Sequence, residues 1–264
     1  MSEELVVTVE NGVGTLRFNR PDSMNALSPY IFKTAVETLE AWAIDESVKC
    51  IVVTGTGRAF CAGGDVKAMN SGQNVGGMTT EQKLTRQRGL HKFSGLLYSI
   101  PKVTIAAVNG VAAGAGFAIS LACDLRIASD KARFTTAFSK VGFSGDLGIT
   151  WPLTRILGEG KAKEFLLLSE MISVDEAYRL GLVNKVVPDD EFQGAVDELA
   201  ARFAEGPQIS YRLIKENVSK ASTHDYAELL EREVFTQVYC METDDHKEGA
   251  RAFVEKRKPV FKGH

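Results

Sequence analysis

The chain has 264 residues, of which 44% are hydrophobic and 25% are charged. This composition is typical of a globular protein, and the length allows a large buried core. The net charge of −3 argues against a nucleic-acid-binding protein. No secretory signal is visible, and no apolar run reaches the roughly 18 residues that a membrane span needs. We therefore expect a cytoplasmic protein with no nucleic-acid or membrane partner.

Four cysteines are scattered along the chain, at Cys50, Cys61, Cys123 and Cys240. They form neither a CxxC pair nor the Cys/His spacing of a zinc site, and they do not suggest a disulfide framework. We expect free, buried thiols in a reducing compartment, and no metal site.

The first elements expected are a hairpin and a helix. Apolar residues at 5–9 and 13–18 flank Asn11-Gly12, a dipeptide favoured in tight hairpin turns. Ser28-Pro29 then combines a helix N-cap with proline at the first helical position. Apolar residues follow at helical spacing up to Trp42. These signals predict a β-hairpin followed by an amphipathic helix.

Two loops rich in glycine and alanine each follow an apolar run that predicts a strand. The first loop covers residues 59–67 (AFCAGGDVK), after the strand at 50–54. The second covers residues 109–116 (NGVAAGAG), after the strand at 103–108. Small residues let a backbone come close to a ligand, and two converging N–H groups form an oxyanion hole. The pair of loops therefore predicts a reaction that passes through an enolate.

The pattern of elements changes near residue 190. Before it, helical patterns at 84–99 and 115–122 alternate with the strands, which favours an α/β core. After it, helical patterns follow one another with few strand signals, at 196–204, 209–221, 226–239 and 246–256. We expect an α/β core over residues 1–190 and a helical region over residues 191–264 that serves assembly and active-site closure.

Further motifs accompany the two loops, namely Phe18-Asn19-Arg20-Pro21, Met24-Asn25-Ala26-Leu27, Leu121-Ala122-Cys123-Asp124 and residues 253–262 (FVEKRKPVFK). Together they resemble the crotonase superfamily (enoyl-CoA hydratase/isomerase) over nearly the whole chain. The resemblance implies a spiral of ββα units with a C-terminal helical region, assembled as a homotrimer or homohexamer. It also implies an acyl-CoA thioester substrate and no metal or redox cofactor, because coenzyme A enters as part of the substrate.

The resemblance assigns roles to individual residues. The oxyanion donors would be the backbone N–H groups of Gly64 and Ala115, and Ala115 would begin a helix whose dipole adds to the effect. Contacts to coenzyme A are implied for Ala62 and Gly63 near the adenine, Lys67 at a phosphate, and Phe261 and Lys262 from a neighbouring subunit.

The acid/base group departs from the hydratase pattern. Hydratases of this family carry two glutamates, and the matching positions here are Ala118 and Phe138, which cannot transfer a proton. Asp146 lies in a glycine-flanked turn that resembles the place where certain isomerases of the family carry a single carboxylate. We therefore predict an enoyl-CoA isomerase/hydratase-type enzyme with Asp146 as the single acid/base, and we favour isomerisation.

Structural roles compete with these assignments. Asp146 also suits a helix N-cap, and Asp65 suits a turn or cap. Asp124 suits a residue that caps or orients backbone. His91 falls in a predicted helix with no partner suggested by spacing, which favours a surface or capping role.

Other functions stay open. Gly114-Ala115-Gly116 opens a helix after a strand, as in a dinucleotide-binding fingerprint. However, Ile119 replaces its third small residue, and no acid follows about twenty residues on. Loss of the glutamates also fits a catalytically reduced protein that only binds CoA esters. The loops do not separate isomerisation from hydration through Asp146 or another acid, thioester hydrolysis or decarboxylation.

Overall fold

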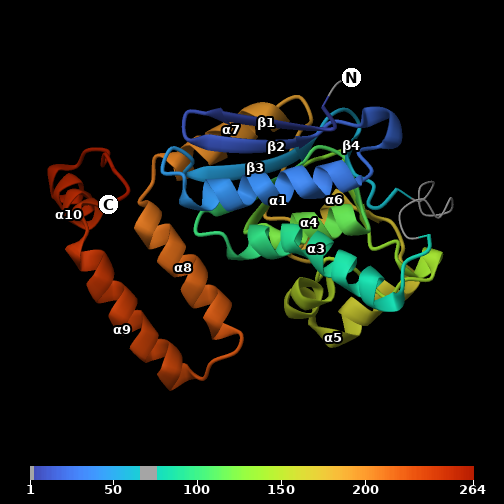
Figure 1. Ribbon diagram of the computed structural model, residues 1–264. Helices are drawn as coiled ribbons and strands as arrows, with labels where there is room; N and C mark the ends of the chain where they lie inside the picture. Colours follow the sequence, from blue (N-terminus) through green and yellow to red (C-terminus); the bar gives the residue numbers. More distant parts are fainter. Residues whose placement is uncertain (1–2, 66–75) are drawn as a thin grey trace.

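Three consecutive strand–strand–helix units form the core of the molecule (Figure 1). The computed structural model describes residues 3–65 and 76–264. The first strand of each unit enters one sheet and the second strand enters another, so the chain advances as a spiral. The units are β3 (Cys50–Gly55), β4 (Ala59–Cys61) and α3 (Thr80–Ser99); β5 (Val103–Val108), β6 (Val111–Ala113) and α4 (Ala115–Ala122); and β7 (Leu125–Ser129), β8 (Arg133–Thr135) and α5 (Thr150–Leu168).

The six-stranded sheet has the order β1-β2-β3-β5-β7-β10, and the four-stranded sheet has the order β4-β6-β8-β9. The strands outside the three units are β1 (Leu5–Glu10), β2 (Val13–Phe18), β9 (Ile172–Ser173) and β10 (Lys185–Val187). β1 and β2 form the predicted antiparallel hairpin. β2, β3, β5, β7 and β10 pair in parallel. The predicted α/β spiral is confirmed.

The predicted first helix is α1 (Pro29–Ile44), which follows the short 3₁₀ turn η1 (Pro21–Ser23). The Ser28 hydroxyl accepts a hydrogen bond from the Ile31 backbone N–H at 3.3 Å, so the predicted N-cap is confirmed. The buried face of α1, from Ile31 to Trp42, joins the main apolar core.

The two faces of β3 belong to two separate apolar clusters. Ile51 and Val53 join the main core, whereas Cys50 and Val52 point the other way, as the period of a strand requires. α7 (Phe192–Ala204) covers this second face. It follows β10, which is itself preceded by α6 (Val174–Arg179). α7 therefore packs as part of the body, although it lies beyond residue 190.

Three helices, α8 (Gln208–Ala221), α9 (Tyr226–Glu242) and α10 (Asp244–Glu255), project from this body as an arm (Figure 1). Lys215 of α8 fastens the arm, because its Nζ donates to Asp124 Oδ2 at 2.8 Å and to the Lys102 carbonyl at 3.1 Å. Asp124 also accepts from the Thr104 backbone N–H at 2.8 Å, which confirms its predicted backbone-orienting role. The arm leaves large apolar side chains exposed, including Val218, Phe235 and Val238.

The cysteines are free, as predicted, and all but the half-buried Cys240 are buried. Desolvation raises the pKa of each buried thiol, Cys50, Cys61 and Cys123, to about 12. Within the described part of the chain, none of the helices is long and apolar enough to cross a bilayer.

Candidate active site

The two small-residue loops lie against each other, main chain to main chain. A Cβ atom on Gly116 would lie 2.1 Å from the Cys61 carbonyl oxygen. A Cβ atom on Gly63, whose φ is +93°, would lie 2.8 Å from the Ala113 carbonyl oxygen and 3.3 Å from the Ala115 nitrogen. Only glycine fits these positions without a shift of the backbone. The glycines therefore serve the approach of one loop to the other, and not only the approach of a ligand.

The same contact extends back along both loops. β4 pairs in parallel with β6, with Cys61 opposite Ala112. A Cβ atom on Gly110 would lie 2.1 Å from the Arg58 carbonyl oxygen. The segments that carry Gly64 and Ala115 are thus held together by strand pairing and by glycine contacts.

Ala115 is the first residue of α4, as predicted. Its N-cap is Gly114, which has no side chain to cap the helix, and every residue of α4 is buried. Among the described residues, neither the Ala115 nor the Gly64 backbone N–H donates a hydrogen bond to a protein acceptor. A buried helix N-terminus with uncapped N–H groups is a favourable place for negative charge.

The motif at residues 19–27 holds the first loop in place through hydrogen bonds. The buried amide of Asn25 donates to the Ala59 carbonyl at 2.7 Å. The Leu27 N–H donates to the Gly63 carbonyl at 2.8 Å. Arg20 donates to Asp65 Oδ2 at 3.2 Å, so Asp65 forms an ion pair with the motif at residues 19–27. The predicted phosphate contact, Lys67, lies outside the described residues.

Asp146 does not cap a helix. α5 begins at Thr150 after the N-cap Ile149, and no side chain caps it. The carboxylate oxygen Oδ1 of Asp146 instead accepts the Leu147 backbone N–H at 2.9 Å. The N-cap interpretation of Asp146 is therefore wrong.

Two side chains of α3 complete the surroundings of Asp146, and the sequence analysis missed both as site residues. Gln87 Nε2 donates to Asp146 Oδ1 at 2.8 Å, and His91 Nε2 lies 2.5 Å from the same oxygen. A hydrogen bond between His91 and Asp146 requires the Nε2–H form of the ring. His91 lies on the surface, as expected, with its side chain 44% exposed, but it also has a partner, Asp146, that the spacing did not suggest. The only sequence signal was the spacing of four residues, which places Gln87 and His91 on one helix face.

The positions that match the two glutamates of hydratases are apolar and buried, with Ala118 1% and Phe138 6% exposed. The Phe138 ring lies 3.9 Å from where a Gly114 Cβ would be, and the Phe138 carbonyl accepts the Phe143 N–H at 2.9 Å. Phe138 thus links the second loop to the segment that carries Asp146. Of the three acid positions considered, only that of Asp146 holds a group that can transfer a proton.

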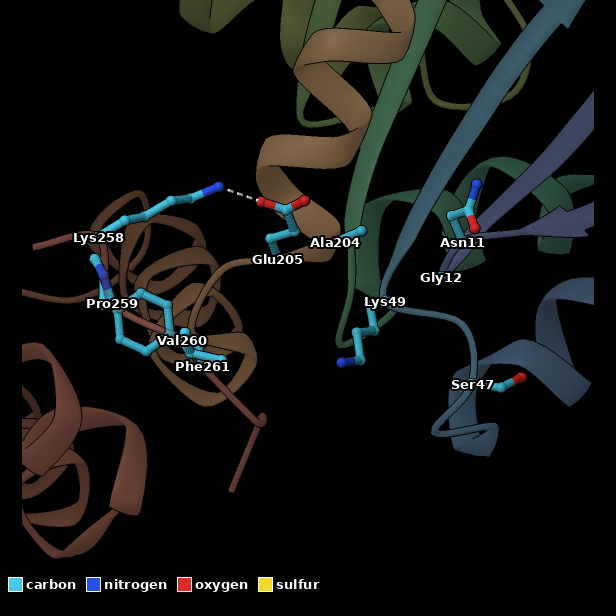
Figure 2. Close-up of a pocket in the computed structure, with 10 residues that line it drawn as sticks. All are labelled: Asn11, Gly12, Ser47, Lys49, Ala204, Glu205, Lys258, Pro259, Val260 and Phe261. Atoms are coloured by element: carbon cyan, nitrogen blue, oxygen red, sulfur yellow. Dashed lines mark hydrogen bonds and ion pairs between the residues drawn. The ribbon is translucent and has the colours of Figure 1, made fainter.

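The residues implied in coenzyme A binding fall into two groups. Ala62 is half-buried and Gly63 is buried between the loops. Phe261 lines a pocket of about 490 Å³ formed by the β1–β2 turn, the segment just before β3, the end of α7 and the C-terminal tail (Figure 2). This pocket lies at the opposite end of β3 from the loop that carries Gly64.

The tail itself is fixed to α10. The Lys262 and Gly263 backbone N–H groups donate to the Asp245 carboxylate at 2.6 and 2.9 Å. Figure 2 also shows Lys258 paired with Glu205 across the pocket, at 2.6 Å. In a single chain, Phe261 and Lys262 are therefore not part of the loop site. A contact with coenzyme A of a neighbouring subunit stays a prediction.

Comparison with known proteins places these features in a family. Residues 8–264 match the family model described as enoyl-CoA hydratase/isomerase. The 1,2-epoxyphenylacetyl-CoA isomerase of Escherichia coli is 35% identical, with 100% of each chain covered. The 4-chlorobenzoyl coenzyme A dehalogenase-2 of Arthrobacter is 36% identical, with 86% of this chain and 83% of the relative covered. A solved enoyl-CoA hydratase of Polaromonas sp. JS666 is 32% identical and superposes with a TM-score of 0.91, covering 98% of this chain and 99% of that one.

Proposed function

Because the chain belongs to the enoyl-CoA hydratase/isomerase family, we propose that it is an acyl-CoA isomerase that uses Asp146 as acid and base. One observation carries the proposal: Asp146 is a carboxylate held in place by α3, while both positions of the hydratase glutamates are buried and apolar. Two-glutamate hydration has no proton-transferring groups here, whereas a single carboxylate is sufficient to move a double bond.

The proposed reaction starts with the thioester carbonyl between the Gly64 and Ala115 N–H groups. Their hydrogen bonds withdraw electron density from the carbonyl, and Asp146 removes a proton from C2 of a 3-enoyl-CoA. The dienolate oxygen then lies at the uncapped start of α4, where the helix dipole adds to the stabilisation. Asp146 returns the proton to C4, which gives the conjugated 2-enoyl-CoA. Each oxyanion donor contributes roughly 3–4 kcal/mol to lowering the barrier.

An assay pair tests this proposal. We expect wild-type protein to isomerise 3-hexenoyl-CoA and to hydrate crotonyl-CoA only slowly. Asp146→Asn should lower the isomerisation rate roughly 10²- to 10⁴-fold, the usual contribution of a positioned acid/base. Strong hydration that persists in Asp146→Asn would favour a hydratase with another acid. Unchanged, negligible turnover of both substrates in both proteins would favour a binding protein without catalysis.

A second candidate reaction is hydrolytic substitution on the acyl group. His91 Nε2 lies 2.5 Å from Asp146 Oδ1, so a carboxylate that can act as nucleophile has beside it an imidazole whose other ring nitrogen can take up a proton. One relative with 36% identity is a 4-chlorobenzoyl coenzyme A dehalogenase. Asp146 would displace chloride from the ring to form an ester, and water deprotonated by His91 would hydrolyse the ester to the hydroxylated product. Repeated chloride release from 4-chlorobenzoyl-CoA, reduced to a single turnover in His91→Gln, would support this reaction over isomerisation.

We also propose that the chain assembles as a homotrimer or homohexamer in the cytoplasm, with the arm as its main contact. The support is the set of exposed apolar side chains on α8 and α9, including Val218, Phe235 and Val238. Light scattering coupled to gel filtration measures the assembly. A monomer at micromolar concentration would contradict this proposal.

A further inference from the structure

We propose that Gln87 is a positioning residue that separates the tasks of the two Asp146 oxygens. In this view the protein holds Oδ1, and Oδ2 exchanges the proton with the substrate. The inference rests on the proposed function, in which Asp146 is the acid and base, and it adds the reacting atom and the residue that selects it.

The contacts of Asp146 are asymmetric. Gln87 Nε2, His91 Nε2 and the Leu147 backbone N–H all lie within 2.9 Å of Oδ1. Within the described residues, no donor contacts Oδ2. The side chain of Asp146 is 27% exposed, so it is not sealed inside the protein.

This asymmetry decides where a proton can be accepted. A proton on Oδ1 would occupy a lone pair that the three N–H groups use, and at least one of those hydrogen bonds would be lost. A proton on Oδ2 leaves all three in place. The C2–H bond of the substrate therefore breaks toward Oδ2, and the same oxygen delivers the proton to C4 when the double bond has moved. No further reactant is needed.

The three donors differ in how firmly they can set the orientation of the Asp146 carboxylate. The Leu147 N–H belongs to the turn itself, where Gly145, Leu147 and Gly148 all have positive φ and the Leu147 side chain is buried in the core. The Nε2 donor of His91 depends on the tautomer of its ring. Gln87 supplies an uncharged donor from the interior of α3 at every pH. It therefore connects the turn to a rigid helix and fixes the rotation of the carboxylate.

Gln87→Met tests this role, because methionine keeps the length and helix preference of glutamine but has no donor. We expect kcat for 3-hexenoyl-CoA isomerisation to fall roughly 10- to 100-fold, the range for a lost hydrogen bond to a charged group. We expect KM to stay within about twofold, because the contact acts on the chemical step. The control is Arg88→Met on the neighbouring exposed position, which should leave both constants unchanged.

Gln87→Glu distinguishes positioning from space filling. Glutamate keeps the shape of glutamine but places a negatively charged acceptor beside Asp146. We expect kcat to decrease in the order wild type, Gln87→Met, Gln87→Glu. If Gln87 only filled space, Gln87→Glu would be the more active of the two variants, and that order would overturn the inference.

A double substitution shows whether Gln87 acts through Asp146. In an Asp146→Asn background, Gln87→Met should cause no further loss in single-turnover isomerisation. Equal losses in both backgrounds would indicate a structural role and contradict the inference. An Asp146→Asn variant with wild-type isomerisation would instead overturn the proposed function. An inactive Asp146→Asn together with a fully active Gln87→Met would overturn the inference alone.

Discussion

The two halves of the candidate active site are built in opposite ways. The half proposed to hold the oxyanion, here called the oxyanion half and formed by residues 59–65 and 109–116, consists of main chain packed on main chain. Glycines occupy its three tightest contacts, at Gly63, Gly110 and Gly116. The carboxylate half, formed by Gln87, His91 and Asp146, consists of side chains from distant parts of the chain. Gln87 and His91 lie on α3, 59 and 55 residues before Asp146 in the sequence. The carboxylate half also stays open to solvent, with His91 44% and Asp146 27% exposed.

The two halves should differ in how well they tolerate substitutions. A backbone site has no side chain to adjust, so one added methyl group must move the whole loop. A side-chain site with three donors on one oxygen loses function in steps, because each donor is replaced separately. We therefore expect abrupt losses from changes in the oxyanion half and graded losses around Asp146.

Gly116→Ala should have the largest effect outside Asp146 itself. The new Cβ would lie 2.1 Å from the Cys61 carbonyl oxygen, so β4 and the amide of Gly64 must shift. A displacement of about 1 Å at reacting atoms costs about 10²-fold in rate, and we expect at least that loss in kcat/KM. Gly194→Ala is the control, because its Cβ meets nothing within 4 Å and lies within α7. Equal activity of both variants would contradict a tightly packed oxyanion half.

Asn25→Ala should have a smaller effect that combines stability and activity. Asn25 is fully buried, has φ 58°, and donates to the Thr56 and Ala59 carbonyls at 3.0 and 2.7 Å. Its loss leaves buried acceptors with fewer donors, which costs roughly 2 kcal/mol of unfolding free energy. Loosening of the first loop should lower kcat/KM about tenfold, as for a lost hydrogen bond in a positioned site. Urea unfolding measures the effect on stability, and the isomerase assay measures the effect on activity. A loss of stability without any loss of activity would show that Asn25 does not position the oxyanion half.

The same difference explains what could be predicted from the sequence. Gly63 and Gly116 were visible because close backbone contacts demand particular residue types at fixed positions. Gln87 and His91 were not, because helical side chains of these types occur on any surface and their partner lies 55 or more residues away.

The three-residue strands β4, β6 and β8 escaped prediction for a related reason. Residues 59–61 and 111–113 lie within the small-residue loops, and their strand conformation comes from pairing with each other. The hairpin at residues 5–18, the Ser28 cap and α4 could be predicted because their signals are local. The overall spiral was implied by resemblance and not by any local pattern.

His91→Gln should have a modest effect on isomerisation. Glutamine keeps a donor on the same face of α3, and Gln87 and the Leu147 N–H still hold Oδ1 of Asp146. We expect kcat to fall about threefold, less than for a hydrogen bond lost outright. Steady-state isomerisation of 3-hexenoyl-CoA measures it. Loss of activity equal to that of Asp146→Asn would show that His91 itself takes part in proton transfer, and the carboxylate half would then be as intolerant as the oxyanion half.

Thiol labelling should have no effect on activity, and it tests the rigidity of the oxyanion half directly. Cys61 lies in that half, is fully buried, and contacts the Gly63 N–H through its Sγ at 3.4 Å. Burial raises the pKa of its thiol to about 12, so the reactive thiolate is scarce at any pH below that value while the protein stays folded. The pKa falls to its ordinary value on unfolding, so the neutral thiol contributes stability that is lost only as the pH rises above that ordinary value.

Iodoacetamide at pH 8 should therefore modify Cys240 alone in the native protein, and all four cysteines in urea. Mass spectrometry of the labelled peptides gives the site, and the isomerase assay on the same sample gives the activity. Labelling of Cys61 on the time scale of Cys240 would mean that the two loops separate in the native state. The loops that carry the Gly64 and Ala115 amides would then lie together only transiently, and the contrast between a rigid backbone half and an adjustable side-chain half would not hold.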